Sequence, residues 1–123
     1  MQELTKKERQ IMNIFWNENK SLSANNIILL DSSLSKNTVQ AVLRKLLKYK
    51  LIHVVDIGYS GTVLTRLYEA RISQEEFVAE LLTDDAFKNL LANYIENTDD
   101  NTELDMLDRL IQEKKQKLKK DNE

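Results

Sequence analysis

The side chains best suited to chemistry gather between residues 35 and 48 of the sequence. Asn37 and Gln40 carry amides that can form two hydrogen bonds with the edge of adenine, and Ala41 can contact the methyl group of thymine. Hydroxyl and cationic side chains in the same segment can bind phosphate groups, which fixes position without reading base sequence. These phosphate-binding candidates are Ser35, Lys36, Thr38, Arg44, Lys45 and Lys48. The segment therefore predicts contacts with a DNA duplex.

The charge of the chain is distributed unevenly along its length. The formal net charge is −2, but residues 1–70 carry ten Lys or Arg against six Asp or Glu, whereas residues 71–123 carry eight against fourteen. No acidic residue lies between Ser32 and Val55, the stretch that contains the candidate DNA contacts. Because local charge governs attraction to a polyanion, this stretch favours nucleic-acid binding. The alternative is a basic helix face that is only solvated.

Residues that could build an enzyme or a metal centre are scarce. The chain has one histidine and no cysteine, and it lacks a glycine-rich phosphate loop, so a catalytic or metal-ligand set is hard to assemble. Adjacent acidic pairs at residues 75–76, 84–85 and 99–100 lie at expected helix starts, where capping accounts for them. We therefore predict no catalytic residues, no metal site and no cofactor. The histidine, His53, is expected to be exposed or next to a phosphate.

A helix is expected to position the candidate DNA contacts. Ser35 can cap this helix, which is predicted to run to about Tyr49. Apolar residues recur on one side of it with the spacing of an amphipathic helix that packs on a core. They are Val39, Val42, Leu43, Leu46 and Leu47. The opposite side, which carries the amides and cations, is left free.

Two helices are expected before this one and a β-hairpin after it. Thr5–Glu8 has the form of a capping box for a helix ending near Asn19, and Ser23 can cap a short helix through Leu30. Residues 51–57 and 62–68 are rich in β-branched and apolar residues, as strands are, and they flank a loop bounded by two glycines. Three helices followed by a hairpin form a winged helix-turn-helix, in which the third helix enters the major groove. The predicted fold class is mainly α with a small β-hairpin.

The expected hairpin loop carries two further candidate DNA contacts. Tyr59 and Ser60 could touch the minor groove or the DNA backbone from its tip. The tip contains neither Lys nor Arg, so we expect it to contribute little affinity.

Residues 71–123 are expected to be helical and to pair with a second chain. Their helices are short, and their apolar faces need a partner to be stable. The candidate interface residues are Phe87, Leu90, Leu91, Tyr94, Ile95, Leu104, Leu107 and Ile111. The prediction is thus a winged helix-turn-helix domain in residues 1–70 and a C-terminal helical dimerisation region in residues 71–123. A twofold homodimer implies a near-palindromic DNA operator. The alternative is a monomer in which these helices pack back on the wing.

No segment is expected to enter a membrane. No apolar run approaches the roughly 20 residues that span a bilayer. The N-terminal residues also lack the apolar stretch of a secretory signal. A cytoplasmic location is the simplest interpretation.

Motifs along nearly the whole chain are similar to those of one known family. The sequence resembles the BlaI/MecI/CopY family of bacterial transcriptional repressors at Leu4–Trp16, Ser23–Ile28, Ser35–Leu46, Lys50–Ile52, Tyr68, Ser73–Phe77 and Leu90–Glu96. The resemblance implies a dimeric repressor that binds a double-stranded DNA operator and blocks transcription.

The resemblance also implies a way to relieve repression. In β-lactam-responsive members, a membrane sensor protease triggers cleavage between Asn and Phe in the dimerisation region. The matching positions here are Asn93 and Tyr94, so a tyrosine replaces the phenylalanine. The alternative is that both are ordinary helix positions, with Tyr94 in the dimer core.

Two departures from the family limit which of its properties can be expected of this chain. Gln40 and Ala41 stand where the family often has Arg and Thr, so the operator sequence is not transferred. The cysteine cluster of copper-responsive members is absent. An alternative function is a winged-helix protein–protein interaction module without direct DNA readout, which the acid-free stretch disfavours.

Overall fold

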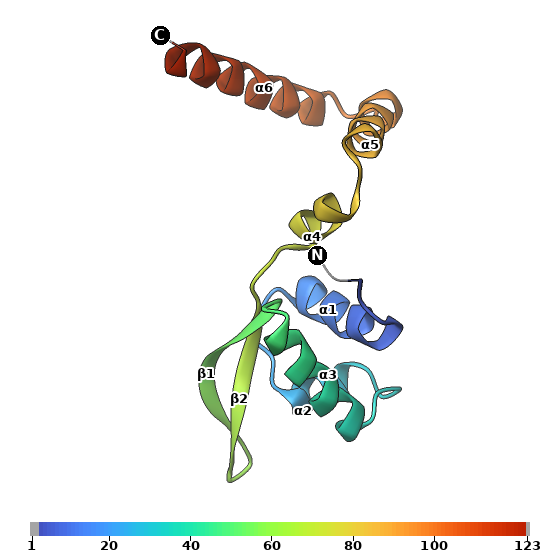
Figure 1. Cartoon of the computed structure of the whole chain (residues 1–123), viewed down its shortest axis with the longest axis vertical. Coiled ribbons are helices and arrows are strands. Elements are labelled where there is room, and N and C mark those ends of the chain that lie inside the picture. Colours follow the sequence, from blue (N-terminus) through green and yellow to red (C-terminus); the bar gives the residue numbers. More distant parts are fainter. Residues whose placement is uncertain (1–2, 123) are drawn as a thin grey trace. The chain divides into compact units, whose positions relative to one another are not determined.

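The structure is a computed structural model that describes residues 3–122, except for the side chain of Ser60. The described elements are α1 (Lys6–Glu18), α2 (Ala24–Leu30), α3 (Lys36–Lys48), β1 (Ile52–Ser60), β2 (Val63–Ala70), α4 (Gln74–Leu81), α5 (Asp84–Asn97) and α6 (Asn101–Asp121) (Figure 1). The chain forms two compact units, the first ending at Leu81 and the second beginning at Leu82. We call them the winged unit and the helical unit.

Side-chain capping fixes where the first two helices begin. The Glu8 amide donates to Thr5 Oγ1 at 3.2 Å, and the Thr5 amide donates to Glu8 Oε1 at 3.0 Å. Ser23 and Asn26 exchange the same pair of bonds at the start of α2, at 3.1 and 2.9 Å. These reciprocal bonds satisfy amides that have no partner inside the helix. Both helix starts predicted from the sequence are therefore observed.

The β-hairpin is longer than the sequence predicts. Strands β1 and β2 pair in antiparallel register from Ile52 opposite Ala70 to Ser60 opposite Val63, with a bulge between Val54 and Asp56. The turn lies at Gly61, whose φ of 66° is accessible to glycine at little steric cost. Tyr59 and Ser60 were expected in a loop but belong to β1, because a short turn after Ser60 leaves their backbones paired. The Ser60 side chain lies outside the described part of the chain.

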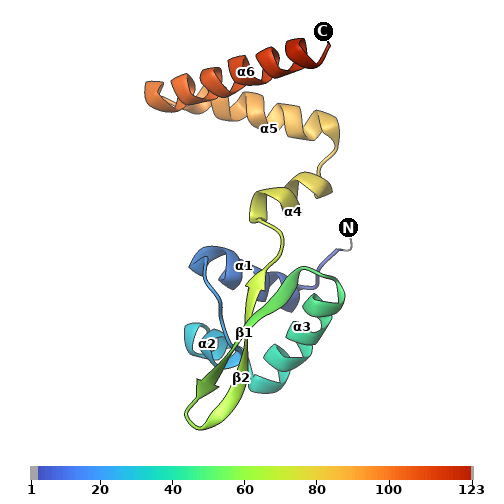
Figure 2. The same cartoon turned by 90° about the vertical axis from the view of Figure 1, so that its left-hand side faces the viewer.

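The core of the winged unit is assembled from α1, α2, α3 and the base of the hairpin (Figures 1 and 2). The segment before α2 joins the sheet, since Leu22 and Tyr68 exchange two backbone hydrogen bonds of 2.9 Å. Four of the five expected α3 core residues are buried, and Leu47 is half-buried against the same cluster. The buried hydrophobic residues are Leu4, Ile11, Met12, Phe15, Leu22, Ile27, Leu34, Val39, Val42, Leu43, Leu46, Leu51, Ile52, Tyr68 and Phe77.

Helix α4 belongs to the winged unit. The rings of Phe77 and Trp16 lie 5.6 Å apart between centroids, and Phe77 is buried. Trp16 Nε1 donates to the Ile72 carbonyl at 2.9 Å, which fixes the segment that leads into α4. The compact unit therefore extends beyond residue 70, the predicted end of the winged-helix domain. The predicted fold class, mainly α with a small β-hairpin in a winged helix-turn-helix, is confirmed.

The helical unit consists of α5 and α6, joined at Thr98–Asp100. Thr83 caps α5 by accepting from the Ala86 amide at 3.1 Å, and Asp100 caps α6 by accepting from the Thr102 amide at 2.9 Å. Neither helix contains a buried residue. Among the residues that the structure describes, no helix combines the length and apolar character needed to cross a bilayer.

Candidate nucleic-acid interface

Helix α3 begins at a pair of hydroxyl side chains. Ser35 Oγ accepts from the Thr38 amide at 3.1 Å and lies 2.8 Å from Thr38 Oγ1. Ser35 is exposed and Thr38 is half-buried. Helix N-termini favour anions, because their free amides and their dipole present partial positive charge. The start of α3 therefore presents partial positive charge beside the Ser35 hydroxyl group, and phosphate binding by Ser35 and Thr38 stays a prediction.

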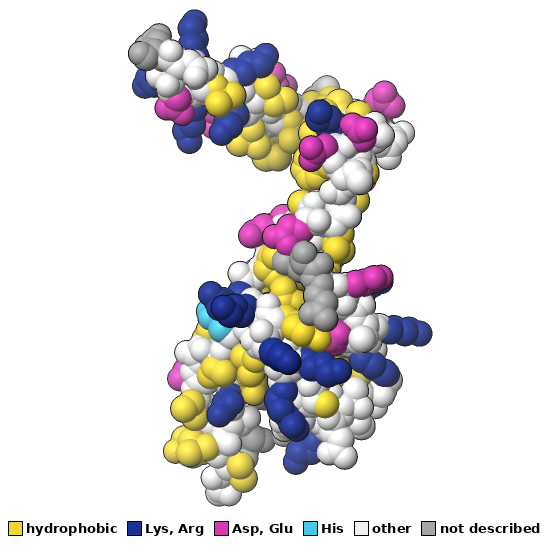
Figure 3. All heavy atoms as spheres, viewed as in Figure 1, with side chains coloured by type: hydrophobic (Ala, Val, Ile, Leu, Met, Phe, Trp, Pro, Cys, Tyr) yellow, Lys and Arg dark blue, Asp and Glu magenta, His cyan; other side chains and the backbone are white. Residues whose placement is uncertain are grey.

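The two sides of α3 differ sharply in burial. Gln40 and Lys45 are exposed, whereas Val39 and Leu46 have no solvent-accessible surface. The other expected base and phosphate contacts on this helix share the exposed side; they are Lys36, Asn37, Ala41, Arg44 and Lys48. Lys and Arg side chains gather on the face of the winged unit that includes α3 (Figure 3). The helix thus keeps its polar side free while its apolar side builds the core.

A hydrogen-bonded turn that was not predicted from the sequence precedes α3. Gln10 Nε2, on α1, donates to Asp31 Oδ2 at 2.6 Å. Asp31 Oδ1 accepts from both the amide and the hydroxyl of Ser33, at 3.0 and 2.6 Å. The Asp-Ser-Ser sequence after α2 is a signal for such a turn. The role of Gln10 could not be predicted from the sequence, because Asp31 lies 21 residues away.

The hydrogen bonds around Asp31 favour its ionised carboxylate. Hydrogen bonds from the Ser33 side chain, and then from Gln10, hold the pKa of the Asp31 carboxyl below its usual value. A folded-state pKa that is lowered stabilises the fold above the unfolded-state pKa and loses that effect as pH falls through the folded value. The turn before α3 is therefore complete at neutral pH.

The hairpin, or wing, presents apolar side chains to solvent. Tyr59 is 73% exposed, and Ile57, Val63 and Leu64 are each more than 60% exposed. Arg66 is exposed on β2 opposite Ile57. Arg66 was not among the predicted DNA contacts, because its position on the wing depends on the register of the two strands. Apolar surface dominates the outer half of the wing, as the hydrophobic side chains in Figure 3 indicate.

His53 lies near the start of β1. His53 is exposed and paired with Glu69 across the sheet, in agreement with one of the two expected placements. Within the described residues, no group of three or more histidine or acidic side chains is arranged to hold a metal ion.

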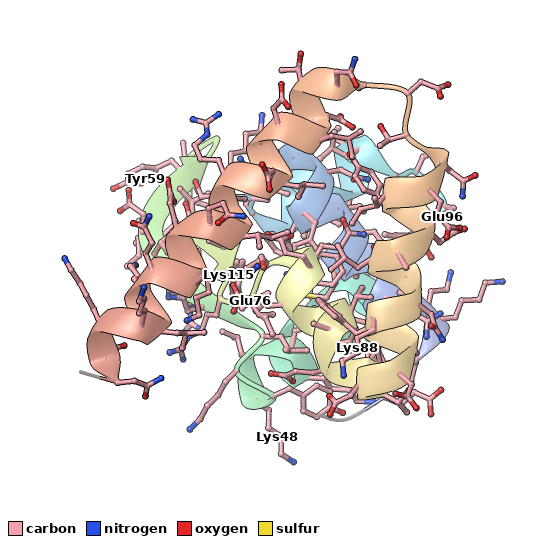
Figure 4. The ribbon with its side chains drawn as sticks, turned by 90° about the horizontal axis from the view of Figure 1, so that it is seen from above. Lys48, Tyr59, Glu76, Lys88, Glu96 and Lys115 are labelled. Atoms are coloured by element: carbon pink, nitrogen blue, oxygen red, sulfur yellow. The ribbon has the colours of Figure 1, made fainter. Side chains whose placement is uncertain are left out.

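The expected dimerisation residues lie on α5 and α6 with much of their surface exposed. Exposed fractions range from 40% for Ile95 to 56% for Leu90, while Leu104 and Leu107 are half-buried. Met106, Leu110 and Leu118 add to this surface, although they were not among the predicted residues. Helices α5 and α6 diverge from their shared turn, and Lys115 lies on the inner side of α6 (Figure 4). The groove between them, about 310 Å³, is lined by Leu91, Ile95, Leu107, Leu110, Ile111, Lys114 and Lys115.

Comparison with known sequences identifies the family of the chain. The profile of the penicillinase repressor family matches residues 4–113. The chain belongs to this family. The match spans both units and confirms the resemblance to bacterial transcriptional repressors seen in the sequence.

The crystal structure of the adhesin competence repressor (AdcR) from Streptococcus pyogenes is similar, with 13% sequence identity and a TM-score of 0.46. That similarity covers 94% of this chain and 81% of the other. No curated protein matches this chain.

The residues expected at the cleavage point of this repressor lie inside α5. The Asn97 side chain donates to the Asn93 carbonyl at 2.8 Å. Tyr94 donates its hydroxyl proton to the Glu103 carboxylate on α6. This hydrogen bond raises the pKa of the Tyr94 hydroxyl above its usual value. Both residues are exposed, but the peptide bond between them is part of a continuous helix.

Proposed function

We propose that this repressor binds a double-stranded DNA operator through the exposed side of α3. The observation that carries the proposal is the placement of Gln40 and Lys45 in solvent on a helix whose other side is buried. A helix with one free polar side can enter the major groove without disturbing the core. The winged helix-turn-helix and the family membership support the same function.

In this proposal, base reading and phosphate binding are divided among the α3 side chains. Asn37, Gln40 and Ala41 contact base edges, because amides and methyl groups match adenine and thymine. Lys36, Arg44, Lys45 and Lys48, together with the hydroxyl groups at the start of α3, bind phosphates. Tyr59 on the wing contacts the DNA backbone or the minor groove.

We further propose that the repressor acts as a homodimer on a near-palindromic operator in the cytoplasm. The exposed apolar faces of α5 and α6 support a helical partner, since a stable monomer rarely leaves such a surface uncovered. A twofold dimer presents two α3 helices to two half-sites. Because the two helices are linked, the dimer binds the whole operator more tightly than one unit binds a half-site.

Cleavage between Asn93 and Tyr94, triggered by a membrane sensor protease, would relieve repression in this scheme. The cut would separate α6 from the winged unit and remove most of the apolar surface available for pairing. Because proteases bind extended chains, α5 must first unwind locally around this bond. The two half-sites would then be bound independently, with the affinity of single units.

A substitution at Gln40 tests whether α3 reads bases. Gln40→Ala should relax the preference at one operator position by about 1–3 kcal/mol, because a bidentate contact to one base is lost. The measurement is selection of bound duplexes from a random pool, followed by titration of single-base variants. Gln74→Ala, an exposed glutamine on α4, is the matched control. An unchanged preference profile for Gln40→Ala would show that this side chain does not read bases.

The second candidate function is docking of α3 on a protein instead of DNA. The acid-free, cation-rich stretch between Ser32 and Val55 favours DNA. Salt dependence separates the two, because DNA binding weakens with a log–log slope of about −0.9 for each phosphate neutralised. A flat salt response together with a lack of any selected sequence would favour the protein-binding function.

A further inference from the structure

Helix α6 carries opposite charges at its two ends. Residues 101–113 contain four Asp or Glu and one Arg, whereas residues 114–121 contain five Lys and one Asp. These side chains are exposed, apart from the half-buried Glu103. A helix dipole accounts for cations in the last turn, but the lysines begin two turns before the end of α6. The division of charge needs a further explanation.

The apolar residues of α6 follow a seven-residue repeat. One position of this repeat is occupied by Leu104, Ile111 and Leu118. A second position, three residues later in the repeat, is occupied by Leu107. Lys114 takes that second position one repeat later. This spacing is typical of a seam between paired helices. Asp108 and Lys115 flank the seam on one side, and Glu103 and Lys117 flank it on the other.

Helix α5 leaves much of this seam uncovered. With 14 residues against 21, α5 is about 10 Å shorter than α6 at a rise of about 1.5 Å per residue. Ile111 is 48% exposed and Leu118 is 49% exposed. The groove between α5 and α6 is open along the middle of the seam, where Leu107 and Ile111 line it. A further helix is needed to cover these side chains.

We propose that this helix is α6 of a second copy, lying antiparallel to the first. The proposal rests on the proposed homodimer and specifies how its two chains pair. Antiparallel pairing brings residues on the same flank together. Asp108 then faces Lys115 of the partner subunit, and Lys115 faces Asp108 of the partner subunit. The acidic half of each α6 lies along the basic half of the other.

The charges select the antiparallel arrangement over a parallel one. In a parallel pair, a residue on one flank of a helix faces a residue on the other flank of the partner helix. The two residues differ by about five positions in the sequence. Glu103 would then face Asp108 of the partner subunit, and the lysine-rich ends would lie side by side. Like charges in these positions repel, whereas the antiparallel pair has attraction at both ends. The charge division of α6 thereby determines the direction of pairing.

A charge exchange between Asp108 and Lys115 tests the pairing in the full-length chain. Asp108→Lys alone and Lys115→Glu alone each create two like-charge contacts in a homodimer. Each should raise the dimer Kd by roughly three- to tenfold at low salt, given the size of exposed ion pairs. An equimolar mixture restores both attractive contacts, so heterodimers should exceed the half expected by chance in native mass spectrometry. Asp105→Lys and Arg109→Glu, which lie about 140° and about 180° from the centre of the seam at 100° per residue, are matched controls.

Cross-linking gives a second test that does not depend on charge. Asp108 opposite Lys115 of the partner subunit places the twofold axis near Ile111. The chain has no cysteine, so Ile111→Cys should form a disulfide-linked dimer on mild oxidation. Leu118→Cys should not, because the two copies of that position would lie about 20 Å apart, beyond disulfide reach. A parallel pair would cross-link through both.

The outcomes separate this inference from the proposed homodimer. A dimer in which charge exchange gives only random mixing, or in which Leu118→Cys cross-links as readily as Ile111→Cys, would overturn the antiparallel pairing alone. A wild-type chain that is monomeric by light scattering at high micromolar concentration would overturn the homodimer itself.

Discussion

The winged unit buries many of its apolar side chains, whereas the helical unit leaves its own exposed or half-buried. The winged unit contains all the buried hydrophobic residues of the described chain, drawn from α1 to α4 and both strands. The helical unit has none, although it carries Phe87, Leu90 and Ile111 on regular, well-capped helices. Both units have the local signals for helix formation, but only one has enough surfaces to close a core.

Local sequence signals and burial are therefore separate requirements for a stable unit. Thr83 and Asp100 cap α5 and α6 as effectively as Thr5 and Ser23 cap α1 and α2. Capping satisfies backbone amides within a helix, whereas burial needs a second surface. Two diverging helices cannot enclose a core by themselves. We infer that the winged unit is stable alone and that the helical unit is completed by a partner.

The largest effect is expected from a truncation that removes the end of α5 and all of α6. A chain truncated after Asn93 should be monomeric and lose about 10²- to 10⁴-fold in operator affinity, because binding at two half-sites is no longer linked. Light scattering and a DNA titration measure the two effects. Fluorescence of Trp16 should show that the winged unit still unfolds cooperatively. An intact dimer after truncation would place the interface elsewhere.

Matched leucine substitutions in the two units should affect different equilibria. Leu43→Ala should destabilise the winged unit by about 2–5 kcal/mol, because a fully buried side chain leaves a cavity. Leu107→Ala should leave the unfolding of the winged unit nearly unchanged and instead raise the dimer dissociation constant. Urea unfolding followed by Trp16, the single tryptophan, reports the first effect, and analytical ultracentrifugation reports the second. Equal loss of winged-unit stability in both variants would contradict the separation of the units.

Matched lysine substitutions compare the charged surfaces of the two units. Lys45→Ala should weaken binding to specific and non-specific DNA alike and reduce the magnitude of the log–log salt slope by about 0.9, corresponding to one phosphate contact. Lys88→Ala, an exposed lysine on α5, should leave DNA affinity unchanged. Binding measured at several salt concentrations provides both values. If Lys45→Ala weakened only specific binding, Lys45 would contact a base.

The smallest expected effect is at the wing. Tyr59→Ala should reduce operator affinity by less than about 1.4 kcal/mol, a factor of ten, and should leave the salt slope unchanged, because Tyr59 carries no charge. The variant should keep wild-type stability, since Tyr59 is 73% exposed. A loss larger than that of Lys45→Ala would show that the apolar wing contributes more to binding than the cations of α3.

Much of the winged unit could be predicted from the sequence because its signals are local. Capping boxes at Thr5 and Ser23 and the periodicity of α3 depend on residues three or four positions apart. The hairpin was predicted less accurately. Its turn at Gly61 and its bulge after Val54 depend on how two strands align. The extension of the compact unit to α4 depends on Trp16 and Phe77, which lie far apart in the sequence.

The helices, the amphipathic division of α3 and the uneven charge could all be predicted, because each follows from short-range spacing or composition. Which apolar faces are buried depends instead on how the elements pack against each other. The α3 stripe meets α1 and α2, whereas the stripes of α5 and α6 remain open. The same packing also brings Gln10 to Asp31 in the turn before α3. The physical reason is that burial and long-range hydrogen bonds require surfaces from distant segments, and no local pattern specifies where those segments meet.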